Sequence, residues 1–280
     1  MGILDRAVSM FSPNGQSDPT GPPGLARADV EQRLAGTGGR SFAGVNLSGA
    51  DLSELDLEAA DLSGARLRGA NLRGTNLRSA NLTRAQLCSA DLTGAQLQNA
   101  TLRDANCVDT GALKPPVLEN ADLSGADLTG AELTHANLRG ATLTGAVLDE
   151  ASLGQADLRG ARAGGARLRG ANLRHARLDE ATLSGATLDG ADLTRAQCRG
   201  ANLTGASLVR ANLTGAVLEG ADLSSANLRD AQLDDAVLRG ASVKAASFAG
   251  ADLDGAVLDG ADLDAADFAG AHNYRAPATA

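Results

Sequence analysis

The sequence repeats one five-residue unit, Ala-(Asp/Asn)-Leu-x-Gly, over most of its length. With Leu as the centre of each unit, a first array runs from Phe42 to Cys107 in 14 units, 12 of them centred on Leu. A second array runs from Leu118 to Phe268 in 31 units, 26 of them centred on Leu, and in 30 of the 31 the residue two places earlier is Ala. The fold must therefore bury two apolar residues in almost every unit.

A spacing of five fits neither regular secondary structure. In an α-helix, five steps of about 100° place successive leucines ~140° apart around the axis. In a flat strand, an odd spacing sends them to alternate faces. A chain that bends once per unit instead points every Leu, and the Ala two residues before it, to one inner side. Gly follows two residues after the centre in 18 of the 31 second-array units, as a turn favours, so the units are predicted to stack into a solenoid.

This consensus resembles that of the pentapeptide-repeat proteins, and the resemblance covers residues 42–268. It implies an all-β fold: a right-handed quadrilateral β-helix with four units per coil, Leu in the core and Ala beside it. By that reading the 45 units make about 11 coils, and at ~4.8 Å between stacked strands the rod is about 50 Å long.

The composition agrees with a narrow aliphatic core, because four Phe, one Tyr and no Trp cannot build an aromatic-rich globular interior. The exceptions at the centre position carry their own predictions. Ala163 replaces Leu and is predicted to leave a gap. Phe248 and Phe268 are 20 residues, or one coil, apart and are predicted to stack at the C-terminal end.

One break interrupts the repeat. Centres step by five up to Cys107, but the next clear centre is Leu118, 11 residues on instead of 10. The extra residue is predicted to bulge within residues 108–117, at the prolines, because Pro cannot donate to a strand ladder. Two interpretations remain open: a tolerated one-residue insertion, or a loop that contacts a partner.

The remaining segments are predicted from composition. Residues 12–24 are rich in Gly, Pro and polar residues and predict a flexible linker, whereas residues 25–35 predict a helix that caps the first coil. The predicted organisation is a tail at 1–24, an N-terminal cap at 25–41, the first array at 42–107, a phase-breaking loop at 108–117, the second array at 118–270 and a C-terminal tail at 271–280.

The lack of a recognisable targeting signal and the pattern of cysteines predict a cytoplasmic protein. Asp5 and Arg6 interrupt the first apolar stretch, so it does not have the apolar core of a secretory signal peptide. No run of 18 apolar residues is present to span a membrane. Cys107 and Cys198 are at inward centres and are predicted to be small buried hydrophobes, whereas Cys88 follows a centre and is predicted to be exposed. Their spacing indicates neither a disulfide framework nor a zinc site.

Nothing in the pattern predicts an enzyme or a cofactor. His135 and His175 would be two coils apart on one side, about 10 Å, too far to share a metal or a proton, and His272 is remote in sequence. Carboxylates are at outward repeat positions, where a solvated surface is the expected environment. The glycines follow the five-residue rhythm and form no phosphate-binding loop.

Charge is unevenly distributed along the sequence. The net charge is −9, and residues 219–268 carry 11 acidic side chains against three basic ones. The C-terminal coils are therefore predicted to be an acidic block. Two basic bands interrupt the rest: one comprises Arg66, Arg68, Arg73, Arg78 and Arg84, and the other Arg159, Arg162, Arg167, Arg169, Arg174 and Arg177.

Residues 20 apart share a face if each coil has four units. One such face carries Glu119, Arg139, Arg159, Asp179, Arg199, Glu219, Arg239 and Asp259. The charge along this face largely alternates in sign, which favours pairing between neighbouring coils over a continuous acidic stripe.

Two classes of function follow. MfpA-type, Qnr-type and albicidin-resistance pentapeptide proteins resemble duplex DNA in width and negative charge and bind DNA gyrase or topoisomerase IV, so the resemblance implies topoisomerase protection by an acidic rod. The alternative is a generic interaction scaffold. The C-terminus is too short and polar for the dimerising helix of MfpA-type members, which leaves a monomer or an end-to-end homodimer. Direct nucleic-acid binding is disfavoured because the basic bands lack aromatics.

Either function would be carried by outward side chains. The candidate partner-binding residues are Asp222, Asp230, Asp234, Asp235, Asp252, Asp254, Asp259, Asp262 and Asp264 in the acidic block, and Lys114, Pro115 and Pro116 in the interruption.

Overall fold

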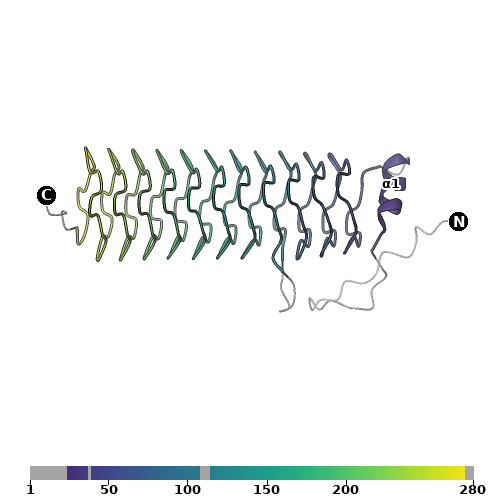
Figure 1. Ribbon diagram of the computed structural model, residues 1–280, viewed down its shortest axis with the longest axis horizontal. Helices are drawn as coiled ribbons and strands as arrows, with labels where there is room; N and C mark the ends of the chain where they lie inside the picture. The colour runs from purple at the N-terminus through teal and green to yellow at the C-terminus, as the bar shows by residue number, and fades with distance from the viewer. Residues whose placement is uncertain (1–23, 37–38, 108–113, 275–280) are drawn as a thin grey trace.

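The computed structural model describes residues 24–36, 39–107 and 114–274. They form a long rod of stacked coils, with α1 (Arg27–Ala35) at one end and the last described residues, up to Tyr274, at the opposite end (Figure 1). Within the described part of the chain, α1 is the one α-helix. The prediction of a flexible tail over residues 1–24 falls almost entirely outside the described residues.

Parallel β-bridges between residues 20 apart define the coil. Asn202, for example, bridges Thr182 on one side and Asp222 on the other. The Asn202 N–H donates to the carbonyl of Ala181 at 2.9 Å, and the Leu203 N–H donates to the carbonyl of Asp222 at 2.7 Å. Because bridging residues recur every five positions along the chain and pair every 20, each coil has four sides.

We name the four sides by one coil: side A includes residues 197–200, side B 202–205, side C 207–210 and side D 212–215. Residues a whole number of coils away belong to the same side. On every side the bridging residue and the residue two places later point outward, and the Leu between them points inward.

Each unit closes with a tight turn that explains the Gly of the repeat. The Ala206 N–H donates to the carbonyl of Leu203 at 2.9 Å, and Gly205 between them has φ +64°, features of a type II turn. Where another residue takes this left-handed position among the described units, it is never Val, Ile or Thr. A β-branched side chain is strained at positive φ.

The core consists of stacked Leu side chains, with one inner column on each side of the coil, and Ala lies beside each column. Leu188 is 0% exposed and Ala186 is 1% exposed, and the same pattern repeats along the rod. The predicted aromatic stack is confirmed: the rings of Phe248 and Phe268 are 5.0 Å apart with planes 7° from parallel. Tyr274 extends the stack at 4.0 Å from Phe268, so an aromatic side chain covers the last layer of this column, which the spacing of five had not indicated.

Local contacts hold α1 against the first coil. The Arg27 guanidinium donates to the carbonyl of Ser53 at 2.9 Å, and the Leu25 N–H donates to the carbonyl of Asn46 at 2.9 Å. The Asp29 carboxylate accepts the Ala26 N–H at 3.0 Å and caps the helix N-terminus. Val30 is 1% exposed and joins the hydrophobic core.

The interruption of the repeat is longer than its spacing suggested. Across it, Asp91 bridges Val117 and Gln96 bridges Asp122, 26 positions apart instead of 20. The insertion is therefore six residues and not one. A six-residue insertion shifts a five-residue pattern by one place, so the sequence spacing could not distinguish the two lengths.

The cysteine predictions were wrong at two of three positions. Cys88, expected to be exposed, is 1% exposed, and it forms a disulfide with Cys107, which is only half-buried. The disulfide links neighbouring coils 19 residues apart in sequence, where the insertion displaces the chain from the regular stack. Cys198 is free and buried, as predicted.

The predicted gap at Ala163 leads to a testable substitution. Ala163 is 3% exposed, one coil from Leu143 and one from Leu183 in the inner column. We expect Ala163→Leu to raise the free energy of unfolding by about 1–2 kcal/mol, because it restores buried apolar area. Chemical denaturation of the two proteins would measure the change.

The matched control is Ala166→Leu. Ala166 is 0% exposed but is at the Ala position beside the column, where a larger side chain overpacks the core and costs about 1–3 kcal/mol. If Ala163→Leu destabilised the protein as Ala166→Leu does, the neighbouring leucines would already have filled the space and the gap would not exist.

Candidate protein-binding surface

The repeat itself positions the outward carboxylates. On side B the Asp222 carboxylate accepts the Ser224 N–H at 2.9 Å, and on side D the Asp192 carboxylate accepts the Thr194 N–H at 2.9 Å. An Asp or Asn at the bridging position thus satisfies a backbone donor of the following turn. Hydrogen bonds from the Ser224 hydroxyl and N–H also lower the pKa of the Asp222 carboxyl.

The nine candidate aspartates do not form one surface, because successive units face different sides. Asp259 is on side A, Asp230 is on side C, and Asp222, Asp262 and Asp264 are on side B. Side D holds the largest group, which we call the acidic patch: Asp234, Asp235, Asp252 and Asp254.

Cations neutralise part of the acidic block outside side D. The Lys244 ammonium is 2.9 Å from the Asp262 carboxylate, and their hydrogen bond lowers the pKa of Asp262 and raises that of Lys244. On side A the Arg239 guanidinium is 3.7 Å from the Asp259 carboxylate. Two of the nine candidates are therefore already engaged by cations.

The acidic patch has no such partner among the described residues. Asp235 and Asp254 are exposed, and Asp234 and Asp252 are half-buried. The two layers of the patch are adjacent, because the Asp235 N–H donates to the Asp254 carbonyl at 2.7 Å. The Asp252 carboxylate accepts a hydrogen bond from the Asn273 amide at 2.9 Å, which links the patch to the last described residues.

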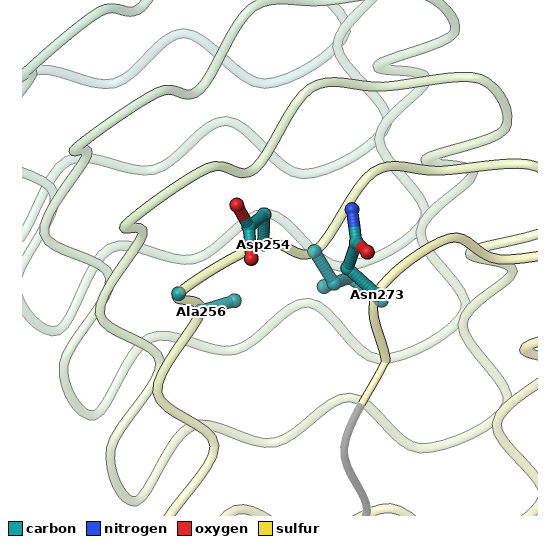
Figure 2. A pocket seen from close by; sticks show the side chains of 5 residues that line it. Asp254, Ala256 and Asn273 are labelled. Carbon is teal, nitrogen blue, oxygen red and sulfur yellow. The ribbon is translucent and has the colours of Figure 1, made fainter.

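A cavity of about 280 Å³ borders the patch at Asp254, and its lining includes both polar and apolar side chains. Figure 2 shows Asp254, Ala256 and Asn273 around it. The lining residues are Leu253, Asp254, Gly255, Ala256 and Asn273.

The basic bands are also partly neutralised. The six arginines of the mid-rod band occupy all four sides of the rod, and four of them have carboxylate partners. Arg159 and Arg177 both pair with Asp157. The other two pairs are Arg167 with Asp149 and Arg174 with Asp192.

The predicted pairing along side A is confirmed at two steps. The Arg199 guanidinium is 3.6 Å from the Glu219 carboxylate, and Arg239 pairs with Asp259 as described above. These side chains are more than half exposed, so each pair contributes little stability. Because of these arginines, side A does not form a continuous acidic stripe.

The candidate residues of the insertion are remote from the acidic patch. Lys114 is exposed, Pro115 is half-buried and Pro116 is buried. Six coils of 20 residues separate Lys114 from Asp234, about 29 Å along the rod. They would form a second surface and cannot share one small contact area with the patch.

The histidines are where the spacing predicted. His135 and His175 are both on side D, two coils apart with Gln155 between them. In the described ranges, no group of three or more His, Cys, Asp or Glu side chains is arranged to hold a metal ion. The same residues include no helix with the length and apolar character needed to cross a membrane.

A four-sided coil of five-residue units, with inward Leu side chains and Asp or Asn at many of the outward bridging positions, defines a class of β-helical solenoid. The family model described as pentapeptide repeats (8 copies) matches this chain at residues 41–78, 80–110, 117–149, 156–195, 191–230 and 231–270. The chain belongs to the pentapeptide repeat family, and its fold is a right-handed quadrilateral β-helix.

Several solved structures are similar. HetL, a pentapeptide repeat protein involved in heterocyst differentiation regulation from Nostoc sp. strain PCC 7120, is 32% identical over 88% of this chain and 96% of its own, with a TM-score of 0.35. Rfr23 from Cyanothece 51142 is 36% identical over 31% of this chain and 58% of its own, with a TM-score of 0.31.

QnrB1, a plasmid-mediated fluoroquinolone resistance protein, is 22% identical over 75% of this chain and 92% of its own, with a TM-score of 0.27. No curated protein matches the sequence. Pentapeptide repeat proteins are generally non-enzymatic interaction scaffolds.

Proposed function

We propose that this chain is a non-catalytic, cytoplasmic solenoid that binds a protein partner through the acidic patch. The rod of about 11 coils, with α1 as its N-terminal cap, serves as a rigid support. The observation that carries the proposal is the position of Asp234, Asp235, Asp252 and Asp254 on one side of two adjacent coils, without a cationic partner among the described residues.

The chemistry of the patch favours a partner with a basic surface. Carboxylates on adjacent coils repeat about every 4.8 Å, and an unneutralised row of negative charge attracts a basic surface from a distance. Proteins that bind duplex DNA present such basic surfaces to its phosphates. DNA gyrase or topoisomerase IV is the most concrete partner, with protection from a topoisomerase poison as the biological effect.

A generic scaffold is the second candidate, and the charge pattern of side A favours it. A DNA mimic needs acidic side chains along the rod, but Arg199 and Arg239 pair with carboxylates one coil on. Under this alternative a partner unrelated to topoisomerases would bind the patch or the surface at Lys114, Pro115 and Pro116.

A supercoiling assay with purified gyrase tests the proposal. Titration of the protein, with and without a fluoroquinolone, should rescue supercoiling from the poison or inhibit it directly. The variant that changes all four patch aspartates to Asn should need at least about tenfold more protein for the same effect, a loss of ~1.4 kcal/mol in binding.

The control variant makes the same change in net charge elsewhere. It replaces Glu54, Glu58, Glu150 and Glu180 with Gln, at exposed positions on sides A, B and C, and should behave as wild type. Equal loss in both variants would assign the effect to net charge and not to the patch. No effect of the wild-type protein at any concentration would exclude the topoisomerase hypothesis and leave the scaffold.

A further inference from the structure

We propose that Cys88 and Cys107 form a reversible redox pair that selects between two positions of Cys107. In the disulfide form Cys107 is bonded to Cys88 outside the hydrophobic core. In the dithiol form its side chain packs in the inner column of side D, between Leu87 and Leu133.

The disulfide form is the one described above. Cys88 and Cys107 are joined with their Cα atoms 4.6 Å apart, and neither belongs to the core cluster that contains Leu87 and Leu133. Cys88 is buried but Cys107 is half-buried, so Cys107 is the more exposed residue of the pair.

The repeat specifies the second position. The Leu87 N–H donates to the Asn106 carbonyl at 2.9 Å, so the chain is still in register at Asn106. In regular units the next residue is the inward centre. The Glu132 N–H donates to the Ala105 carbonyl at 2.8 Å, which makes Leu133 the following member of the column.

Cys198 shows that a cysteine fits this position. It occupies a centre in the second array and is 0% exposed. A free Cys behaves as a small buried hydrophobe. A reduced Cys107 would therefore become buried in the column, whereas the disulfide keeps its side chain out of it. The two forms are therefore alternative placements of one side chain and not one placement with and without a bond.

The pair also anchors the insertion. The residue after Cys88, Ser89, donates its N–H to the Lys114 carbonyl at 2.7 Å, and its hydroxyl accepts the Lys114 N–H at 2.9 Å. Cys88 and Ser89 thus hold the chain on both sides of the insertion, one by a covalent bond and the other by hydrogen bonds. Reduction releases only the Cys107 end.

The redox step is a thiol–disulfide exchange with glutathione. On reduction, one glutathione thiolate attacks the Cys107 sulfur, and the Cys88 thiolate leaves and takes up a proton. A second glutathione then attacks the mixed disulfide on its glutathione sulfur, which releases Cys107 as a thiol and forms oxidised glutathione. Two electrons pass from two glutathione molecules to the protein disulfide.

A thiol count on the folded full-length chain tests reversibility. The protein is equilibrated with either reduced or oxidised glutathione, then unfolded in excess alkylating reagent and weighed intact. We expect three alkylated cysteines after reduction and one, Cys198, after oxidation. Three in both states would show that no disulfide forms, and one in both would show a permanent cross-link; either result overturns the proposal.

The position of reduced Cys107 is tested in Cys88→Ser, which cannot form the bond. Under native conditions Cys107 should be alkylated on the order of 100-fold more slowly than in urea, because its reaction would need local opening of the column. Alkylation at the unfolded rate would overturn the inward position. Cys198 is the internal reference, because burial raises the pKa of its thiol to about 12 and keeps it unreactive.

Two controls separate the switch from misfolding. Cys198→Ser keeps the pair and should change from two alkylated cysteines to none between reduced and oxidised glutathione. Circular dichroism of Cys88→Ser should match that of the wild type. If that variant does not fold, Cys107 in the reduced wild-type protein is mapped by peptide mass instead, with the same expected rate.

Discussion

Leu188→Ala is expected to lower the free energy of unfolding by about 2–5 kcal/mol, the range for a buried Leu truncated in a packed core. Leu188 is 0% exposed, and the inner column has Leu168 and Leu208 one coil to either side. A solenoid is stabilised by contacts between neighbouring repeats. The truncation therefore removes packing against both neighbouring coils at once.

Chemical denaturation followed by circular dichroism measures this loss. Gln232→Ala is the surface control, because Gln232 is exposed and its truncation should change stability by less than about 0.5 kcal/mol. A loss below about 1 kcal/mol for Leu188→Ala would mean that the column closes around the space. Unfolding in separate steps would show that coils melt independently, and each step would then be compared between variants.

Proline at two nearby outward positions is expected to destabilise the protein to very different extents. Asn202→Pro removes the N–H that donates to the Ala181 carbonyl at 2.9 Å, and the loss of this ladder hydrogen bond leaves a buried acceptor unsatisfied, at a cost of about 1–3 kcal/mol. Thr204→Pro is expected to cost less than about 1 kcal/mol, because Pro is common at the second residue of a type II turn.

The Thr204 N–H donates to the Asn202 side chain at 3.0 Å and, among the residues that the structure describes, donates no hydrogen bond to the backbone of a neighbouring coil. The two substitutions lie two positions apart in the same coil and both introduce Pro, so their location is matched. Their unfolding midpoints should separate clearly. Equal midpoints would contradict the assignment of residues 202–205 to a ladder position followed by a turn.

Most of the fold could be predicted from the sequence because every unit repeats the same local requirements. Leu must be buried, Gly or another unbranched residue must accept positive φ, and Asp or Asn accepts a hydrogen bond from the turn. These requirements predicted a column of Leu flanked by Ala. The stack of Phe248 on Phe268 followed from their separation of one coil, and so did the pairing of Arg199 with Glu219.

The candidate site could be predicted only as a stretch of acidic sequence. Residues 219–268 are acidic, but consecutive units face different sides, so the nine aspartates are distributed over all four. Lys244 and Arg239 engage Asp262 and Asp259, which a sum over the sequence cannot reveal. The acidic patch emerged only when the register of the coils was known.

The sequence by itself determined the five-residue unit and the composition of the core, because the period records one bend per unit, and its resemblance to the pentapeptide-repeat family implied the four-sided coil. The tertiary structure alone decided the six-residue length of the insertion, the bond between Cys88 and Cys107, the cover that Tyr274 provides and the isolation of the acidic patch. Each of these depends on which residues of neighbouring coils meet in space. Local periodicity is unchanged by those contacts and therefore cannot encode them.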